Sequence, residues 1–479
     1  MKNFKFLFLA LIVLAIAGVA LFFFGQKEKR EFQLPSPSLV EGGKEIKGGG
    51  ALGAEVGTGW SAKENPREAT KEAIDMALEG KVNKRPDFAI MFATSGSDLE
   101  AIFSEARKLL GNETKIYGGT TDSRAVMINK GFVKAKKDNY NYALKEGKLA
   151  LAIMTISSKD IVFGVGSADF SAYPSAQEGA KSAVLSAIVS AGKSPNELPK
   201  IVLITPTKGI YTEEDTIKGI EEVVGGKTVI IGGSAGGPKW AVFGKDKVYP
   251  EGVSVAVIYT DLPVGWVFEG GFDVTDNKSG IITKVDGRNI IEIDNRPALD
   301  VYNEWLNGGI DKLYSQYSDF RRIKDLLTLH PLYRRYTAEN GQVYSLFSHP
   351  FPKDQTLKER AVATSTTLNV GEQVNLSHGS WETLVNRIGN LPRLAKFNGD
   401  MDINTKSILG IGYVCAGVMG AIPEPEREKL PPLINYTNSQ APFIAPFTWG
   451  EQGHFSGIGN KHGNLLTSFI VIGPKKERR

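Results

Sequence analysis

An internal repeat limits the possible folds of this chain more than any other feature. Residues 54–160 and 161–272 contain the same elements in the same order, and each copy opens on a glycine-rich strand. These openings are Val56-Gly57-Thr58-Gly59 and Phe163-Gly164-Val165-Gly166. A helix, a buried strand, a second helix and two more strands follow each opening, so the repeated unit is βαβαββ. Two such units predict an α/β domain with pseudo-two-fold symmetry.

Both copies place small residues where their strands end. The buried strand of each copy ends on threonine or serine, and the next strand runs into a glycine pair, Gly118-Gly119 or Gly232-Gly233. We expect Ser97 and Thr212 to cap the helices that lie between these strands. Because related copies pack about a common axis, the polar strand ends are expected to meet in one cleft.

The remaining segments have simpler patterns. Residues 31–53 are rich in proline, serine and glycine and are predicted to be a flexible linker. Residues 273–473 are predicted to form a second, strand-rich α+β domain, and residues 474–479 are a basic tail. The fold class is therefore mixed α/β, with a duplicated first domain and an α+β second domain.

The first 30 residues contain an unbroken apolar run from Phe6 to Phe24. A run of this length can cross a bilayer as a helix. A cleaved signal peptide is the alternative, with Ala15-Ile16-Ala17 as its cleavage site. The continuation of the apolar run through Phe24 favours an uncleaved anchor. The sequence thus predicts a single-pass membrane protein whose globular part is extracytoplasmic.

The distribution of charge excludes one class of function. The formal net charge is +4, but basic residues gather before Glu31 and after Pro474, which leaves an acidic body. A nucleic-acid-binding protein is expected to have a basic body. The chain contains one cysteine, Cys415, so no intrachain disulfide can form. In its apolar context Cys415 is interpreted as a small core residue.

The predicted ligand site consists of the strand ends of both copies. Glycine allows backbone amides to approach a carboxylate, and nearby hydroxyl groups add hydrogen-bond donors. The alternative is that the glycines serve only a tight exit from the strand. We expect Glu451 and His462 to close the site, with Glu451 offered to an amine and His462 as a donor. The strand-end residues are Thr94, Ser95, Gly118, Gly119, Thr120, Thr121, Thr205, Thr207, Gly232, Gly233 and Ser234.

Two sequence patterns offer alternatives to the predicted ligand site, one catalytic and one metal-binding. The sequence from Gly232 to Gly236 fits G-x-S-x-G after a strand, which would make Ser234 a hydrolase nucleophile. That motif requires a helix immediately afterwards, and Gly237-Pro238 is a poor helix start. Glu451, His454 and His462 are ligand types for a metal, but their glycine-rich segment does not fix the side chains together. We therefore expect no metal and no catalytic residue.

The chain resembles the FIST family from Ala54 to Gly473. In the repeat the resemblance rests on Gly57-Thr58-Gly59-Trp60-Ser61, on Pro86 to Ile90 and on Tyr117 to Asp122. Its most specific part in the second domain is Asn289 to Tyr302, and His330-Pro331-Leu332, Cys415-Ala416-Gly417, Thr448 to Gly453 and His462-Gly463-Asn464 complete it. Family members usually have His-Asn without an intervening glycine, and an arginine shortly after the cysteine. Gly463 and Gly417-Val418-Met419 are departures from these patterns.

The resemblance implies FIST N-terminal and C-terminal domains that bind a small molecule such as an amino acid in signal transduction. Some relatives are thought to sense gases through histidine-bound haem. Here the repeat contains no histidine, so no haem is expected. The five histidines are His330, His349, His378, His454 and His462.

The sequence therefore predicts a membrane-tethered sensory protein that binds a small polar molecule, with a separate signalling protein as partner. No output domain follows Gly473 in this sequence. The alternatives are a serine-dependent hydrolase that uses Ser234, and an adaptor for a membrane signalling partner.

Overall fold

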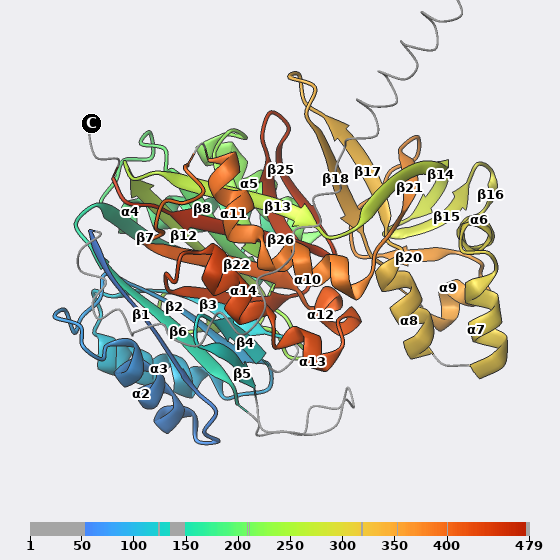
Figure 1. The fold of residues 1–479 in the computed structure, drawn as a ribbon. Helices are drawn as coiled ribbons and strands as arrows, with labels where there is room; N and C mark the ends of the chain where they lie inside the picture. The colour runs from blue at the N-terminus through green and yellow to red at the C-terminus, as the bar shows by residue number, and fades with distance from the viewer. Residues whose placement is uncertain are drawn as a thin grey trace, which may run out of the picture. The chain divides into compact units, whose positions relative to one another are not determined.

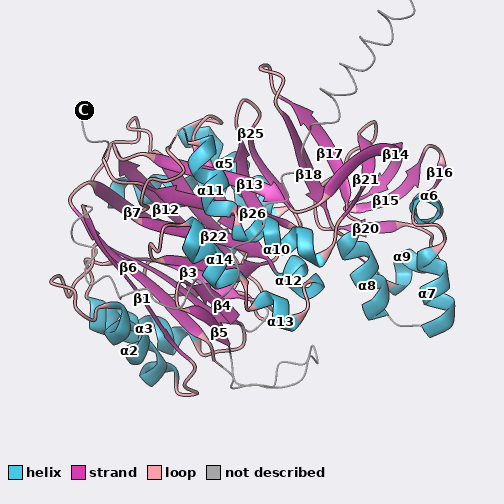
Figure 2. Cartoon of the chain, viewed as in Figure 1, coloured by secondary structure: helices cyan, strands magenta, loops and turns pink. Residues whose placement is uncertain are grey.

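The computed structural model describes residues 53–122, 125–134, 149–207, 209, 211–317, 320–351, 353–399 and 401–475. Within these ranges the chain forms three six-stranded sheets and one larger sheet, and helices pack against them (Figure 1, Figure 2). The predicted mixed α/β class is therefore confirmed.

The two copies of the repeat form two sheets with the same strand order, β1–β6–β2–β3 and β7–β12–β8–β9. Their registers also agree, because Ile156 pairs with Phe88 in the first sheet and Ile258 pairs with Ile201 in the second. The predicted duplication is confirmed. The strands are β1 (Ala54–Ser61), β2 (Phe88–Thr94), β3 (Lys115–Thr121), β6 (Leu151–Ser158), β7 (Ile161–Asp169), β8 (Ile201–Pro206), β9 (Val229–Gly233) and β12 (Gly252–Thr260).

A third sheet repeats this arrangement, which the sequence did not predict. It contains β13 (Val264–Gly270), β26 (Leu466–Ile472), β22 (Leu409–Cys415) and β23 (Phe443–Thr448) in the order β13–β26–β22–β23. Here Ile472 pairs with Leu409, as Ile156 pairs with Phe88. The chain thus contains three equivalent units. The third is split in sequence by a long insertion after β13, so no continuous repeat pattern marks it.

One glycine near the start of each unit explains the shared packing of the first strand and first helix. A Cβ atom at Gly57, Gly164 or Gly265 would lie 1.9, 2.0 or 2.1 Å from the carbonyl oxygen of Ala77, Ala187 or Ala395, respectively. These alanines belong to α2 (Pro66–Ala77), α4 (Ala176–Ser190) and α11 (Leu391–Asn398). Each helix therefore approaches its strand to a distance that only glycine allows.

Replacing Gly164 with alanine is expected to destabilise the fold by about 1–3 kcal/mol, because the carbonyl of Ala187 must move away from the new methyl group. Urea denaturation followed by circular dichroism measures the change. Gly420→Ala is the matched control, since Gly420 has no atom within 4 Å of the added Cβ position. Equal stability of the two variants would contradict the close-packing explanation.

The three units exchange short hairpins. After its third strand the second unit sends β10 (Val242–Phe243) and β11 (Val248–Tyr249) to the first sheet, where Val242 pairs with Gly119. The third unit sends β24 (Glu451–Phe455) and β25 (Gly459–Gly463) to the second sheet, beside β9. The first unit sends β4 (Ala125–Ile128) and β5 (Gly131–Lys134) to the third sheet, beside β23. The exchange forms a closed cycle, so each sheet is completed by another unit.

The three sheets share one core. Apolar residues of all three, such as Phe92, Leu203 and Ile411, pack together there. The hydroxyl of Tyr117 lies 2.7 Å from that of Thr205 and 2.7 Å from that of Tyr413, so one buried hydrogen-bonded group joins the three units. Helices cover the opposite faces, for example α2 and α3 (Leu99–Leu110) on the first sheet and α4 and α5 (Thr212–Val224) on the second.

The insertion in the third unit has a sheet and a core of its own. Its strands lie in the order β18–β17–β21–β14–β15–β20–β19, with β16 beside β15. Ile282, Tyr302 and Leu376 are among its buried core residues. The strands are β14 (Asp273–Asp286), β15 (Asn289–Ile293), β16 (Arg296–Pro297), β17 (Leu332–Thr337), β18 (Val343–Ser348), β19 (Pro350–Phe351), β20 (Val362–Thr364) and β21 (Gln373–His378). The helices are α6 (Ala298–Trp305), α7 (Gly309–Tyr317), α8 (Phe320–Leu329) and α9 (Asp354–Lys358).

The remaining four helices belong to the third unit: α10 (Trp381–Gly389), α12 (Ala416–Ala421), α13 (Glu424–Arg427) and α14 (Leu430–Thr437).

One predicted cap in the first unit was wrong by one residue. Asp98, rather than Ser97, caps α3, because its carboxylate accepts the N–H of Ala101 at 3.0 Å.

The predicted transmembrane helix is withdrawn. Among the helices of the described residues, none is both long enough and apolar enough to cross a membrane. The run from Phe6 to Phe24 lies outside the described residues. The single-pass membrane location and the extracytoplasmic placement rested on that run alone, so they are withdrawn with it.

Candidate functional site

The predicted site residues of the first unit bond to neighbouring strands and loops. Their glycines are explained by close packing, since a Cβ at Gly118 would lie 1.9 Å from Met91 O and one at Gly119 would lie 2.6 Å from Ala241 O. The hydroxyls of Thr94, Ser95, Thr120 and Thr121 accept the N–H groups of Ala150, Lys239, Ala241 and Phe447 at 2.9, 2.8, 3.3 and 2.9 Å, respectively. The bonds of Ser95, Thr120 and Thr121 therefore hold the first unit to the other two, whereas the bond of Thr94 lies within the first unit.

The predicted residues of the second unit divide into two groups. Thr205 belongs to the central hydroxyl group, and Thr207 accepts the N–H of Gly252 at 2.9 Å. Gly232 and Gly233 pair with β24, and a Cβ at Gly233 would lie 2.5 Å from Thr448. Replacing Gly119 or Gly233 with valine would therefore disturb the packing of the protein as well as the binding of any ligand, so such variants cannot test the predicted site. The carbonyl of Thr207 accepts the hydroxyl of Thr212 at 3.2 Å, which connects this strand end to the start of α5.

Glu451 is fully buried, and its carboxyl group is held by residues that flank its hairpin. Its carboxyl group accepts hydrogen bonds from the hydroxyl of Thr448 at 2.9 Å and from the N–H groups of Gly450 and Leu466 at 3.2 and 3.3 Å. Burial raises the pKa of Glu451 to about 8. Burial likewise raises the pKa of the Cys415 thiol, which lies in the core. Neither group has the properties of an exposed amine receptor or a reactive thiolate.

Ser234 has the hydrogen bonds of a structural residue. Its side chain is buried, and its hydroxyl accepts the amide N–H of Gln452 at 3.1 Å. His462 lies on the other side of Gln452, with Nδ1 3.2 Å from the same amide nitrogen. Among the described contacts of Ser234 there is no bond to a histidine. The next element in the chain is the strand β10, so no helix begins directly after Ser234. The arrangement lacks the base that a serine nucleophile needs.

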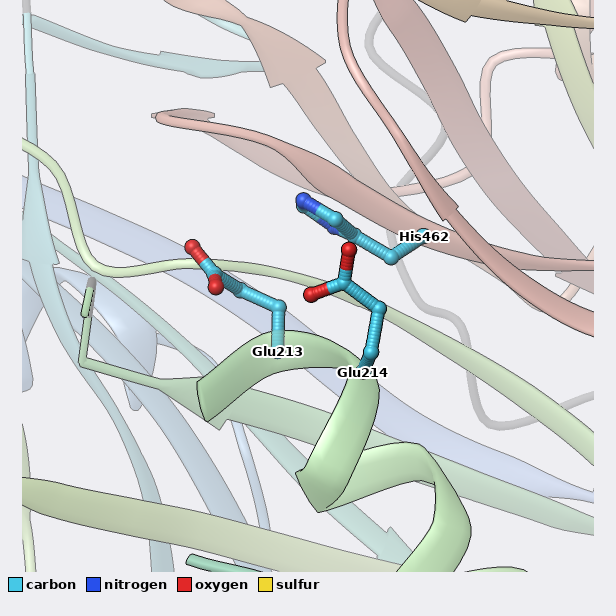
Figure 3. Close-up of side chains that lie close together, drawn as sticks. All are labelled: Glu213, Glu214 and His462. Carbon is cyan, nitrogen blue, oxygen red and sulfur yellow. The ribbon is translucent and has the colours of Figure 1, made fainter. Parts of the chain in front are cut away.

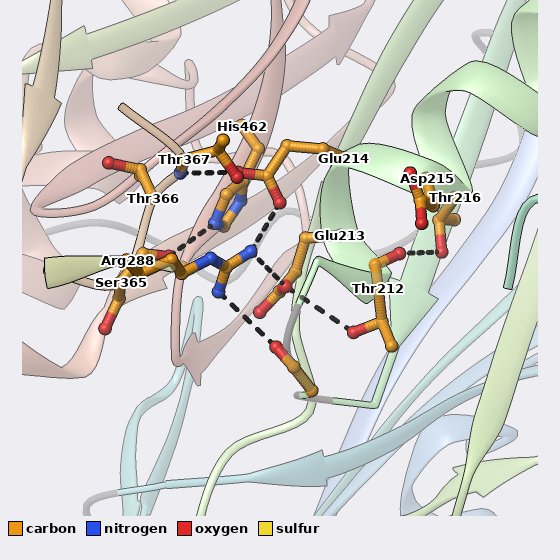
Figure 4. Close-up of polar contacts among 12 residues, drawn as sticks. Thr212, Glu213, Glu214, Asp215, Thr216, Arg288, Ser365, Thr366, Thr367 and His462 are labelled. Atoms are coloured by element: carbon orange, nitrogen blue, oxygen red, sulfur yellow. Dashed lines mark hydrogen bonds and ion pairs between the residues drawn. The ribbon is translucent and has the colours of Figure 1, made fainter. Parts of the chain in front are cut away.

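A cluster of charged residues lies next to Gln452 and was not predicted from the sequence. It contains Glu213, Glu214, Arg288 and His462 (Figure 3, Figure 4). One Nη of Arg288 donates to both carboxylates, at 2.9 Å to Glu213 and 2.5 Å to Glu214. The side chain of Glu213 is fully buried and that of Arg288 is 10% exposed, so this is a buried ion-pair network.

The cluster joins the second unit to the insertion. Glu213 and Glu214 lie in the first turn of α5, and His462 comes from β25. Arg288 comes from the turn between β14 and β15 of the insertion. The loop after β20 completes the group, because Thr367 N–H donates to Glu214 at 2.9 Å and Ser365 O lies 3.3 Å from His462 Nε2.

The start of α5 has an unusual backbone. Tyr211 precedes the helix with φ 67°, in the left-handed region, and makes no side-chain capping bond. The expected cap, Thr212, lies inside the helix instead, because its hydroxyl is bonded to Thr207. The guanidinium of Arg288 lies 5.3 Å from the centre of the Tyr211 ring. Left-handed backbone at a bulky residue costs energy and is more frequent at functional sites than elsewhere.

Electrostatics keep Glu214 ionised. Burial alone would raise its pKa, but His462, Arg288 and the hydrogen bond from Thr367 outweigh burial and hold the pKa of Glu214 at about 2. Desolvation likewise disfavours the charge on Arg288, yet the two glutamates together raise the pKa of this side chain. Glu214 and the guanidinium of Arg288 are therefore charged at neutral pH.

Among the residues that the structure describes, four buried polar atoms of this region have no hydrogen-bond partner. They are Glu213 Oε1, Arg288 Nε, Thr367 Oγ1 and Gln452 Oε1. An unpaired buried polar group costs about 1–3 kcal/mol, so four of them around one cluster need an explanation. A bound polar molecule or ion would supply the missing partners.

The metal-binding set that the sequence suggested is not brought together. The carboxyl group of Glu451 is bonded to Thr448, and His454 Nδ1 lies 2.9 Å from the Asn460 side chain, with its ring against Trp266. In the described parts of the chain, the group with metal-ligand geometry is Glu213, Glu214 and His462. Of these three residues, His462 was predicted from the sequence to belong to the ligand site.

Comparison with known proteins supports part of the predicted resemblance. Residues 87–296 match the family model of the FIST N domain, a range that includes Glu213, Glu214 and Arg288. The resemblance of later residues to a FIST C-terminal domain stays a prediction. No curated protein sequence matches the chain.

Solved structures give only weak likenesses. Cyanuric acid hydrolase from A. caulinodans has a TM-score of 0.35 and 6% identity over 88% of this chain and 100% of that chain. A second cyanuric acid hydrolase structure has a TM-score of 0.30 and 9% identity over the same shares. T. maritima PurL complexed with ADP has a TM-score of 0.22 and 9% identity over 90% of this chain and 74% of that chain. Scores of this size carry no argument about fold or function.

Proposed function

We propose that this protein is a sensory ligand-binding protein that recognises a small polar molecule, with amino acids as the first class to test. The observation that carries the proposal is the set of four unpartnered buried polar atoms around Glu213 and Arg288. The match of residues 87–296 to the FIST N domain, together with the sensory role that the family resemblance implies, supports it. Of the predicted residues, His462 belongs to this cluster. Thr207 is bonded to Thr212 at the start of α5, and Ser234 is bonded to Gln452 beside His462.

The unpartnered atoms require both donors and acceptors from a ligand. Arg288 Nε is a donor, whereas Glu213 Oε1 and Gln452 Oε1 are acceptors, and the Thr367 hydroxyl can act as either. An amino acid offers an ammonium group to the acceptors and a carboxylate to Arg288. A purely apolar ligand would leave all four atoms unpaired.

The location of the cluster provides a route from binding to signalling. Glu213 and Glu214 belong to the second unit, whereas Arg288 and Thr367 belong to the insertion. A ligand that contacts both parts changes the strength of their association. A sensor requires such a difference in interaction free energy between its bound and free states.

Thr367→Val tests the site with little disturbance of the fold. Because Oγ1 of Thr367 is buried without a partner, its removal is expected to leave the free protein as stable or up to about 1 kcal/mol more stable. The affinity for the ligand is expected to fall about tenfold, which corresponds to one lost hydrogen bond. Binding is measured by calorimetry on the full chain in chelator-treated buffer, after a thermal-shift screen of the amino acids.

Ser407→Ala is the matched control, because Ser407 Oγ is also buried and unpartnered but lies just before β22, in the third unit. It should keep full affinity for the ligand. If no amino acid produces a saturable shift, the amino-acid assignment fails. If Thr367→Val and Ser407→Ala bind an identified ligand equally well, the ligand site is elsewhere.

A further inference from the structure

We infer that Glu213, Glu214 and His462 form a binding site for a divalent cation, which goes beyond the proposed recognition of a small molecule. Each residue offers one ligand atom, and these atoms all lie within 4.8 Å of one another. Figure 3 shows the two carboxylates and the imidazole converging from α5 and β25. Two carboxylates and one imidazole are a ligand set that suits divalent transition metals.

A second observation points to a missing cation. Glu213 is fully buried, and its Oε1 has no hydrogen-bond partner. Thr367 Oγ1 and Gln452 Oε1 are unpartnered as well, so three of the four unpaired atoms of the region are oxygens. What the cluster lacks is therefore mainly positive charge or hydrogen-bond donors.

Arg288 satisfies the carboxylates only in part. Its guanidinium donates to Oε2 of Glu213 and to Oε2 of Glu214 and leaves Oε1 of Glu213 free. The formal charge of two carboxylates and one guanidinium is −1, so a divalent cation is attracted despite the arginine. The guanidinium also fixes the two carboxylates, as the surroundings of metal ligands commonly do.

His462 can serve as a ligand through one nitrogen while the other stays hydrogen-bonded. Its Nε2 lies 3.3 Å from Ser365 O, and its Nδ1 lies 3.2 Å from the amide of Gln452. Metal-bound histidines usually anchor their second nitrogen on such a carbonyl oxygen. The carbonyl of Ser365 is thus suited to orient the ring.

The ligand types favour Mn²⁺ or Zn²⁺ over Ca²⁺. Bonds of about 2.0–2.2 Å place neighbouring ligands of one ion roughly 3–3.5 Å apart, so side-chain shifts on the order of 1 Å bring the three residues, whose ligand atoms lie within 4.8 Å of one another, into range. An imidazole ligand suits these ions, whereas Ca²⁺ prefers six or more oxygen ligands.

The competing explanation is a buried ion-pair network that only holds the insertion against the second unit. Both explanations account for the contacts of Arg288, but they differ for Oε1 of Glu213. A purely structural network would not bind a cation at that carboxylate, and loss of its charge would not change the affinity for metal.

The test is titration of the full chain with Mn²⁺ or Zn²⁺ alone, after removal of metal with a chelator and of the chelator by dialysis. We expect one bound ion per chain by calorimetry, loss of the free Mn²⁺ electron paramagnetic resonance signal, and a higher melting temperature. Glu213→Gln is expected to weaken binding at least about tenfold while preserving side-chain size. Glu222→Gln, on the exposed side of the same helix, is the matched control and should bind as the unaltered protein does.

His462→Gln provides a second variant that retains polarity, and it should weaken Mn²⁺ and Zn²⁺ more than Ca²⁺. Before titration, circular dichroism should establish that each variant is folded. Absence of saturable binding to the unaltered protein, or equal affinity in Glu213→Gln and Glu222→Gln, would overturn the inference. Amino-acid binding in the presence of chelator would persist in that case, so failure of the cation site and failure of the proposed sensor function are distinguishable.

Discussion

Replacing Arg288 with methionine is expected to lower the free energy of unfolding at neutral pH by about 3–5 kcal/mol. The guanidinium holds Glu213 and Glu214 together, and the Glu213 side chain is fully buried. Without the guanidinium, one buried and one largely buried carboxylate remain beside each other without their counter-charge. Urea denaturation followed by fluorescence measures the loss.

The control for this variant is Arg296→Met. Arg296 pairs with Glu304, but both side chains are more than half exposed, and exposed pairs contribute about 0–1 kcal/mol. The difference in unfolding free energy between Arg288→Met and the unaltered protein should become smaller as the pH falls from 4.5 toward 2. The reason is that the folded protein holds the pKa of Glu214 at about 2, against an ordinary value of 4.5. In that range the unaltered protein loses the stability that ionised Glu214 contributes. A loss no larger than that of Arg296→Met would show that the network is unimportant for stability.

Replacing Glu451 with glutamine is expected to remove a large pH dependence of stability. Burial raises the pKa of this carboxyl group to about 8, so the folded protein retains a proton that the unfolded chain loses above an ordinary pKa of 4.5. The unfolded state therefore binds fewer protons between these values, and stability falls as the pH rises through this range. The decrease is on the order of 4 kcal/mol, and it is complete once the pH exceeds about 8.

The readout for Glu451→Gln is the slope of unfolding free energy against pH from 5 to 8, rather than stability at one pH. Glutamine keeps the oxygen that accepts from Thr448, but it places an amide nitrogen near Leu466 N–H, so the absolute stability changes as well. Glu64→Gln, at an exposed position, should retain the slope of the unaltered protein. An unchanged slope in Glu451→Gln would mean that Glu451 is ionised in the folded protein.

Sequence patterns sufficed for the repeat because its signals are local. The glycines at Gly57 and Gly164 and the buried strands follow from steric limits within a few residues or between adjacent elements. Strand order and register then agreed between the two copies, since the same local pattern packs in the same way.

The third unit was not predicted because the insertion of residues 273–380 separates its first strand from its first helix. Gly265 contacts Ala395 as Gly57 contacts Ala77, but these partners are far apart in the chain. Exchange of hairpins among units was also invisible, because β24 has the same local pattern whichever sheet it joins.

The candidate site shows the same division. The sequence by itself determined the duplicated α/β unit and the glycine and threonine strand ends. Only the tertiary structure decided that the hydroxyls of Ser95, Thr120 and Thr121 accept hydrogen bonds from other units. It also decided that the charged cluster forms from Glu213, Glu214 and Arg288. Acidic residues in a first helical turn are common because they interact favourably with the helix dipole, so α5 gives no distinctive signal. Burial and an arginine from a distant insertion turn them into a site, and both depend on long-range packing that no local pattern encodes.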